Sequence, residues 1–171
     1  ALYRDGLVTL FAVGGLYAAG TLDMQFSDIM LFAIAMNIAG GIGAIAMARM
    51  DDKLGSRRTI MICLVMLIGL GAILLLLDHK YAFIGVACLL GLFVGPVQAA
   101  SRTMLVRLSP PDHVGAFFGL YALTGKSVAF MGPFAFATVT EIFNSQRLGM
   151  ATILGFWAIG LFLIGRIRAK I

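Results

Sequence analysis

Long hydrophobic stretches separated by short polar segments dominate this chain. A transmembrane helix needs about 20 consecutive, mostly apolar residues, and six stretches of the sequence meet this requirement. They cover residues 1–21, 28–48, 59–77, 81–106, 114–142 and 148–166. The alternation typical of a membrane β-barrel is absent, and runs rich in Leu, Ala, Met and Gly satisfy their backbone groups in lipid as helices. The pattern therefore predicts an all-α, polytopic membrane protein with a six-helix bundle.

Polar side chains are distributed unevenly among the predicted spans. Spans 59–77 and 148–166 contain almost none, whereas the other four carry several. Because polar groups within lipid turn toward protein or water, we expect these four spans to be internal and the other two peripheral. The pattern repeats every three spans, which predicts two inverted three-helix repeats at about 1–78 and 79–171. The candidates for a substrate or proton pathway on the internal spans are Asp5, Thr9, Asn37, Gln98, Tyr121 and Lys126.

Lys126 is the sharpest single feature, because it lies near the middle of its predicted span. It is about 13 residues from His113 and about 15 from Glu141, which places it ~20 Å from either end of a helix. A lysine at that depth costs about 3 kcal/mol on insertion scales. It lies on a stripe of small residues that indicates either a close helix contact or a cavity wall. Lys126 can belong to a substrate or proton site, or it can form a structural ion pair, for which Asp5 is a candidate partner.

Two Gly-Pro pairs, Gly95-Pro96 and Gly132-Pro133, interrupt predicted spans. Proline removes a backbone donor and bends a helix, so we expect kinks at both positions. Such kinks either allow helices to bend as a cavity opens or only shape their packing.

Positive charges are concentrated at one set of span ends, the set that includes both ends of the chain. The opposite ends carry only Lys80 and Arg147. The positive-inside rule then predicts that both chain ends face the cytoplasm. Only 12% of the residues are charged and 61% are hydrophobic, which argues against a water-soluble enzyme. The net charge of +5 forms no basic stripe of the kind that binds nucleic acid.

No cysteine and histidine have metal-ligand spacing, and no nucleophile and base lie together within a span. We therefore expect no metal, no cofactor and no enzymatic activity.

The segment between the second and third spans reads ARMDDKLGSRR, from Ala48 to Arg58. Gly55 permits a tight turn, and Asp52 can accept hydrogen bonds from the first amides of the next helix. Arg57 and Arg58 can reach a carboxylate or the ends of helices. On spacing alone, this segment is either a conformational element or an ordinary basic turn.

The same segment resembles the signature loop of the major facilitator superfamily, in Asp52-Lys53-Leu54-Gly55 followed by Arg57-Arg58. Ala48 and Ser56 stand where that family usually has a glycine and a basic residue. The resemblance implies that this loop stabilises one conformational state of a transporter. The residues assigned to this gating loop are Asp52, Lys53, Gly55, Arg57 and Arg58.

A narrower resemblance extends over nearly the whole chain. Its motifs are Tyr3-Arg4-Asp5-Gly6 with Thr9, Gly95 to Arg102, Phe117 to Tyr121 with Gly125-Lys126, Gly132-Pro133, and Ser145-Gln146-Arg147. They are similar to those of the vacuole-effluxer-like branch of the superfamily, which is related to the autophagy-related vacuolar amino-acid exporter. The resemblance implies that residues 1–171 are the carboxyl-terminal half of a twelve-helix secondary transporter. Such a protein moves small solutes, here amino acids or related metabolites, by alternating access.

A six-helix half needs a second half to enclose a cavity. We expect either an amino-terminal domain outside this sequence or a second copy of the chain, together with membrane lipid and a small-molecule substrate. A bacterial inner membrane is favoured over a vacuolar one. The alternative function is a non-transporting six-helix assembly module that is inactive unless paired.

Overall fold

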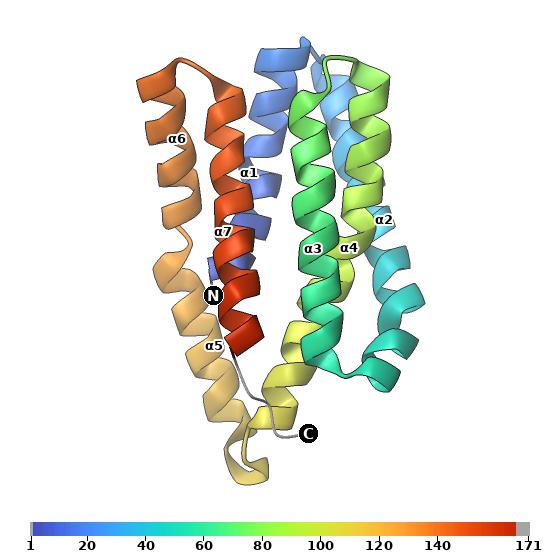
Figure 1. Cartoon of the computed structure of the whole chain (residues 1–171), viewed down its shortest axis with the longest axis vertical. Coiled ribbons are helices and arrows are strands. Elements are labelled where there is room, and N and C mark those ends of the chain that lie inside the picture. The colour runs from blue at the N-terminus through green and yellow to red at the C-terminus, as the bar shows by residue number, and fades with distance from the viewer. Residues whose placement is uncertain (1, 167–171) are drawn as a thin grey trace.

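The computed structural model describes residues 2–166, which form helices joined by short connections (Figure 1). The helices are α1 (Leu2–Leu22), α2 (Phe26–Leu54), α3 (Ser56–Leu76), α4 (Lys80–Leu108), the short 3-10 helix η1 (Pro111–His113), α5 (Val114–Val128), α6 (Met131–Phe143) and α7 (Gln146–Arg166). Six segments of this part of the chain are long and apolar enough to cross a membrane. Pro111–Phe143, which contains η1, α5 and α6, is one of the six. The predicted all-α fold is confirmed, and the chain is a multi-pass membrane protein.

The turn between α2 and α3 is much shorter than the sequence indicates. Both helices extend into the expected loop: α2 ends at Leu54 and α3 begins at Ser56, so that Gly55 alone separates them. Its φ of 83° lies in the region that favours glycine. The Gly55 N–H donates to the Asp51 carbonyl at 3.0 Å, and the Gly55 carbonyl accepts from the Thr59 N–H at 3.1 Å. The same residue therefore closes one helix and opens the next.

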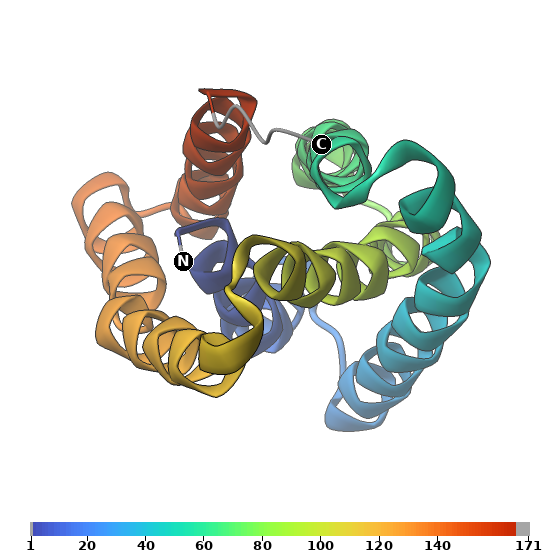
Figure 2. The same ribbon diagram turned by 90° about the horizontal axis from the view of Figure 1, so that it is seen from below.

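The helices form an arc that is backed on one side by α3 and α7 (Figure 2). α2 packs against α4, α3 packs against α4 and α7, and α7 packs against α1 and α6. The two spans with almost no polar side chains thus lie side by side on one face of the bundle. α2, α4, α1 and the α5–α6 pair lie on the other face, with α2 and the α5–α6 pair at its two edges (Figure 2).

The core lies between α1, α3, α4 and α7. Trp157 and Tyr17 are the largest fully buried side chains. The Phe83 ring packs against Tyr17 and Phe32, with ring centroids 5.8 and 5.7 Å apart. α5 contributes no buried residue, so one edge of the arc is held by few contacts within this chain.

α4 continues as one helix through the first Gly-Pro pair, so the helix is not interrupted there. Gly95 instead serves close packing, because a Cβ atom there would overlap the carbonyl oxygen of Gly40 on α2. A Cβ atom on Gly43 would likewise overlap the carbonyl oxygen of Leu92 on α4. Glycines let two membrane helices approach until their backbones touch. Pro96 therefore lies inside an unbroken helix that is clamped against α2.

The fifth span is broken in two near the second Gly-Pro pair (Figure 1). α5 ends at Val128 and α6 begins at Met131. Pro133 has no N–H, so the Ala129 carbonyl has no donor four residues later. The Ala129 N–H donates to the Lys126 carbonyl at 3.3 Å, which tightens the last turn of α5.

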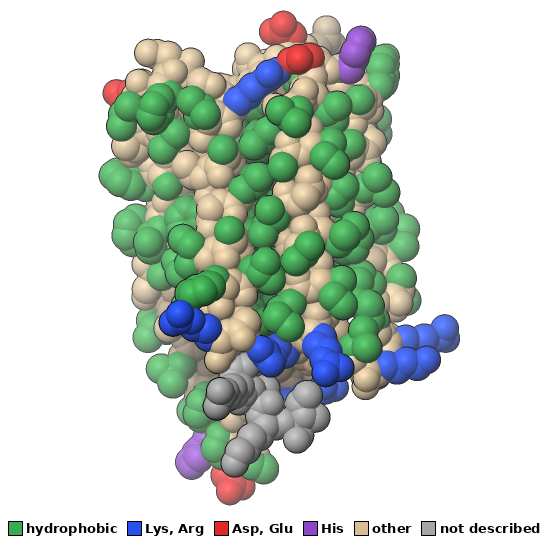
Figure 3. Space-filling view, viewed as in Figure 1, with side chains coloured by type: hydrophobic (Ala, Val, Ile, Leu, Met, Phe, Trp, Pro, Cys, Tyr) green, Lys and Arg blue, Asp and Glu red, His purple; other side chains and the backbone are tan. Residues whose placement is uncertain are grey.

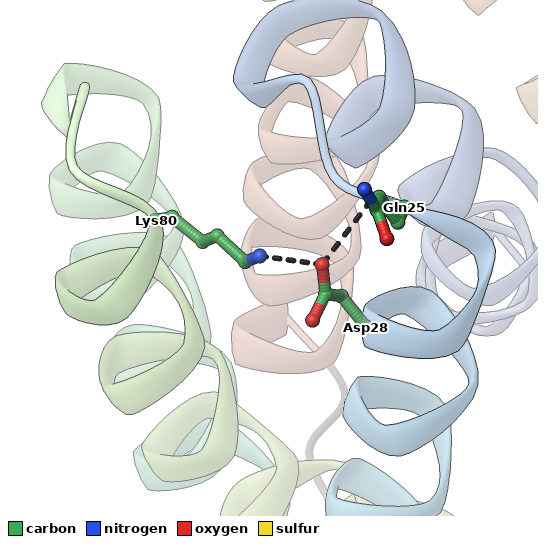
Figure 4. Close-up of polar contacts among 3 residues, drawn as sticks. All are labelled: Gln25, Asp28 and Lys80. Atoms are coloured by element: carbon green, nitrogen blue, oxygen red, sulfur yellow. Dashed lines mark hydrogen bonds and ion pairs between the residues drawn. The ribbon is translucent and has the colours of Figure 1, made fainter.

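Charged side chains separate the two ends of the bundle. Lys and Arg gather at the lower end in Figure 3, whereas acidic side chains lie at the upper end. At the upper end Lys80 pairs with Asp28, which also accepts the Gln25 N–H at 3.2 Å (Figure 4). Arg147 pairs with Asp78. Ion pairs thus join α2 to α4, and α7 to the residues between α3 and α4.

Candidate functional site

An open groove of about 490 Å³ lies between α2 and α4, with Phe11 of α1 at its side. Asn37 of α2 and Gln98 and Arg102 of α4 supply its polar side chains. The Asn37 side-chain amide donates to the Ala33 carbonyl at 2.8 Å. The groove presents amide and guanidinium groups between two helices of membrane-spanning length, on the face of the bundle away from α3 and α7.

The groove exists because small residues line one face of α2. Asn37, Gly40, Gly41 and Ala44 follow one another at steps of three, one and three residues, which keeps them on the same helix face. A Cβ atom on Gly41 would meet nothing within 4 Å. Small side chains therefore leave open space beside a backbone contact that brings α2 and α4 together.

Asp5 and Thr9 are separate from this groove, because they are buried between α1 and α6. They lie one helical turn apart, and their exposed fractions are 3% and 0%. The Gly132 N–H donates to Asp5 Oδ2 at 2.7 Å. Gly132 is in the first turn of α6, where backbone amides have no acceptor within the helix. A Cβ atom at this position would overlap Thr9 Oγ1.

Tyr121 is joined to α1 through Arg4, which was not among the predicted site residues. The Arg4 guanidinium lies over the Tyr121 ring, with its Cζ 4.7 Å from the ring centroid. A cation over an aromatic face is attracted by the negative face of the ring. Arg4 also lies against Gly125, where a Cβ atom would be 2.8 Å from Nη1. The sequence feature that could have identified Arg4 as a site residue is its position directly before Asp5 in the same motif.

Tyr3 and Ser101 form a second polar contact that the sequence alone did not identify. The Tyr3 hydroxyl and Ser101 Oγ are 2.6 Å apart. Ser101 Oγ donates to the Val97 carbonyl at 2.5 Å, so the Tyr3 hydroxyl donates to Ser101. This hydrogen bond ties the beginning of α1 to α4.

Lys126 is exposed in the last turn of α5. The two ion pairs in residues 2–166 are Lys80–Asp28 and Arg147–Asp78, so within this part of the chain Lys126 is not paired with Asp5. Cβ atoms added to Gly115 and Gly119 would meet nothing within 4 Å. The small-residue stripe is therefore not a close helix contact within the described part of the chain.

In the predicted gating loop, Arg57 forms hydrogen bonds to α7, whereas three of the other residues are exposed. Arg57 Nε and Nη2 donate to the carbonyls of Ile164 and Gly165 at 3.2 and 2.6 Å. A cation at these carbonyls also interacts favourably with the negative end of α7. Asp52, Lys53 and Arg58 are exposed.

The inward-facing acid of this loop is Asp51, whereas Asp52, the acid assigned to the gating loop, is exposed. Asp51 is 9% exposed and borders a small pocket of about 170 Å³ together with Thr59 and Thr103. α2 extends to Leu54, so the helical period decides which of two adjacent acids points inward.

Residues 2–166 contain no group of three or more His, Cys, Asp or Glu side chains that could hold a metal ion.

Comparison with known proteins adds evidence over almost the whole chain. The family model described as "Vacuole effluxer Atg22 like" matches residues 1–170. Autophagy-related protein 22 of Cryptococcus neoformans var. neoformans is 26% identical over 182 residues, which cover 97% of this chain and 32% of that protein. Autophagy-related protein 22-1 of Penicillium rubens is 26% identical over 165 residues, covering 85% of this chain and 27% of the relative.

A bacterial protein is also similar. The uncharacterized MFS-type transporter YxiO of Bacillus subtilis is 20% identical over 162 residues, which are 95% of this chain and 38% of that protein. The chain therefore spans about a third of the length of these curated relatives. Because fungal and bacterial proteins both match, the expected preference for a bacterial inner membrane is not supported.

Proposed function

Because this chain belongs to the vacuole effluxer Atg22-like family, we propose that it forms half of a secondary transporter that moves a small solute across a membrane by alternating access. The observation that carries this proposal is the open polar groove between α2 and α4, within six membrane-length helices. Polar side chains at membrane depth face water, solute or protein. One relative, the uncharacterized MFS-type transporter YxiO, supports the same function.

The helix contacts support an internal repeat that relates residues 1–78 to residues 79–171. α3 packs on α4 as α7 packs on α1, and α3 and α7 meet each other. If α1 corresponds to α4 and α3 to α7, each contact in one three-helix unit has a counterpart in the other. A pseudo-two-fold axis between the two units produces this pattern. The chain would then be the carboxyl-terminal half of the transporter.

A second six-helix half completes the proposed cavity. α5 has no buried residue in this chain, and Lys126 and Asn37 are exposed. An amino-terminal half, or a second copy of the chain, would cover this face and place those side chains along an enclosed pathway. Asn37, Gln98, Tyr121 and Lys126 are its proposed polar positions, and the loop from Asp52 to Arg58 is its proposed gating element.

The proposed substrates are amino acids or related small metabolites. Arg102 can bind a carboxylate through paired hydrogen bonds, and Gln98 offers both a donor and an acceptor from the same helix. In the proposed orientation the basic end of the bundle, with both ends of this chain, faces the cytoplasm.

Uptake by the full-length protein in liposomes tests this function. We expect accumulation of a radiolabelled amino-acid mixture, and we expect Gln98→Ala to reduce its rate about tenfold, equivalent to about 1.4 kcal/mol of lost binding. Arg107→Gln is the matched control, because Arg107 is exposed on the same helix outside the groove. Equal rates in wild type and Gln98→Ala would remove the groove assignment. A lack of uptake would favour an assembly module.

A further inference from the structure

We infer that Asp5 and Thr9 form a proton-binding site that controls the bend between α5 and α6. This inference rests on the proposed transporter function, because it assigns a coupling role to a site outside the substrate groove. Three observations carry it: the burial of Asp5 and Thr9, their unpartnered oxygen atoms, and their contact with the break in the fifth span.

The carboxyl group of Asp5 has one oxygen that is engaged and one that is free. Oδ2 accepts the Gly132 N–H at 2.7 Å. Oδ1 is buried and has no hydrogen-bond partner among residues 2–166, and the same is true of Thr9 Oγ1. A buried charge without a partner is very unfavourable. A proton on Oδ1 removes that charge and creates a hydroxyl donor one helical turn from the Thr9 hydroxyl.

Charged side chains on the neighbouring helices do not neutralise Asp5 in the described part of the chain. On α1 itself, the guanidinium of Arg4 lies over Tyr121 of α5, and its buried Nη1 has no hydrogen-bond partner in residues 2–166, so Arg4 forms no ion pair with Asp5 there. Lys126 of α5 and Glu141 of α6 are exposed. On α2, Asp28 is paired with Lys80 of α4 at the far end of the bundle.

The remaining groups near this part of α1 are not charged partners either. The indole of Trp157 on α7 lies against Gly6. The Tyr3 hydroxyl is bound to Ser101 of α4. A proton is therefore the simplest group that can compensate the buried carboxylate.

A sodium ion would make different demands on the site. Cations of this kind need several oxygen ligands around them. In residues 2–166 the buried side-chain oxygens without a partner at this site are Asp5 Oδ1 and Thr9 Oγ1. The proton needs only the carboxyl group that is present.

The break between α5 and α6 links protonation to helix movement. The Gly132 N–H that Asp5 accepts belongs to the first turn of α6. A hydrogen bond to a carboxylate is roughly twice as strong as one to a neutral acceptor. The charged form of Asp5 therefore holds α6 against α1. Uptake of a proton from water at Oδ1 weakens this bond and frees α6 to move about the 129–130 break.

Infrared difference spectroscopy tests the proton site in the full-length protein reconstituted in liposomes. Acidification of the wild type should produce the C=O stretching band of a protonated carboxyl group. Asp5→Asn should remove that band. Asp5→Glu should retain the band at a shifted frequency, which would show that the loss of the band in Asp5→Asn does not come from misfolding. Glu141→Gln, which removes an exposed acid of α6, should leave the band in place. A band that persists in Asp5→Asn, or that sodium chloride abolishes at constant pH, overturns the inference.

A distance measurement tests the link to the bend. Nitroxide labels on Leu120→Cys and Ile142→Cys, whose side chains are 57% and 67% exposed, report the relative position of α5 and α6. Cys63→Ala and Cys88→Ala remove the two thiols of this chain, and any cysteine elsewhere in the full-length protein is replaced in the same way. The distance should change over the pH range in which the carboxyl band appears, and should not change with pH in Asp5→Asn. A distance that does not follow the band overturns the coupling.

Neither measurement needs a substrate. A failed uptake assay therefore leaves the spectroscopic result intact, and a missing carboxyl band leaves the groove and its uptake assay intact.

Discussion

Gly132 brings two side chains of α1 into contact with the start of α6. Its N–H binds Asp5, and its missing side chain makes room for Thr9 Oγ1. A residue with a Cβ atom would push Thr9 away and separate the two helices. Position 132 thus needs a residue whose N–H is free to donate and which has no side chain.

Gly132→Ala should therefore lower the thermal stability of the detergent-solubilised protein. The expected loss is about 1–3 kcal/mol, the usual effect of overpacking a tight contact. Gly155→Ala on α7 is the matched control, because a Cβ atom there meets nothing within 4 Å. Alanine in an open helical position should be neutral or stabilise by roughly 0.5–1 kcal/mol. Equal melting temperatures for the two variants would contradict the contact.

Lys126 differs from Asp5 in its exposure, and the proposed second half of the transporter would cover it. It is exposed here, while Asp5 is almost completely buried. The two residues therefore belong to different layers of the bundle, although both lie on polar spans. This separation is why we propose a role in helix movement for Asp5 and a place in the pathway for Lys126.

At the level of secondary-structure elements, the two Gly-Pro pairs behave differently because of their neighbours. α4 is held against α2 by close contacts at Gly91, Leu92 and Gly95, and it continues through Pro96. α5 and α6 lie at an edge of the bundle (Figure 2), and there the helix breaks. Packing thus decides whether proline bends or interrupts a helix.

The end of α7 depends on the turn between α2 and α3. Arg57 donates to two carbonyls of the last turn of α7. Arg57→Gln should cost about 1–2 kcal/mol, because hydrogen bonds from a charged group are lost at a partly exposed site. Hydrogen exchange of the peptide that contains Ile164 should become faster.

The adjacent residue provides the control for this change. Arg58→Gln removes the same charge from an exposed position and should leave the exchange of that peptide unaltered. If both variants accelerate exchange equally, net charge rather than the Arg57 hydrogen bonds stabilises the helix end.

At the scale of the whole molecule, α3 and α7 form one face and the polar helices form the other. α7 exposes apolar side chains such as Ile159, which is 50% exposed. The opposite face carries the groove, Lys126 and the exposed α5. Lipid is the expected neighbour of the first face, and a water-filled pathway that of the second.

Thiol accessibility in the full-length protein distinguishes these two faces. In a background without Cys63 and Cys88, Lys126→Cys should react with a charged, membrane-impermeant thiol reagent. Ile159→Cys on α7 should react far more slowly, because a thiol in contact with lipid is rarely ionised or reached by a charged reagent. Similar rates at both positions would be inconsistent with a water-filled pathway along α5.

The sequence by itself determined the number of spans, their helical character and the charge difference between the two ends. These properties depend on local hydrophobic length and on the order of charges along the chain. The motifs around Asp5 and Gly55 also indicated the family correctly, because they are contiguous in sequence. Span boundaries were less well predicted, since α2 continues through most of the expected loop.

The tertiary structure decided which polar groups meet. It placed Asp5 against Gly132 rather than beside Lys126, turned Asp51 inward rather than Asp52, and joined Arg4 to Tyr121. Each outcome depends on the rotation of a helix about its own axis and on the point where the fifth span breaks. Hydrophobic length does not fix either property, because any rotation of a membrane helix leaves its length and composition the same. Contacts with neighbouring helices select one rotation.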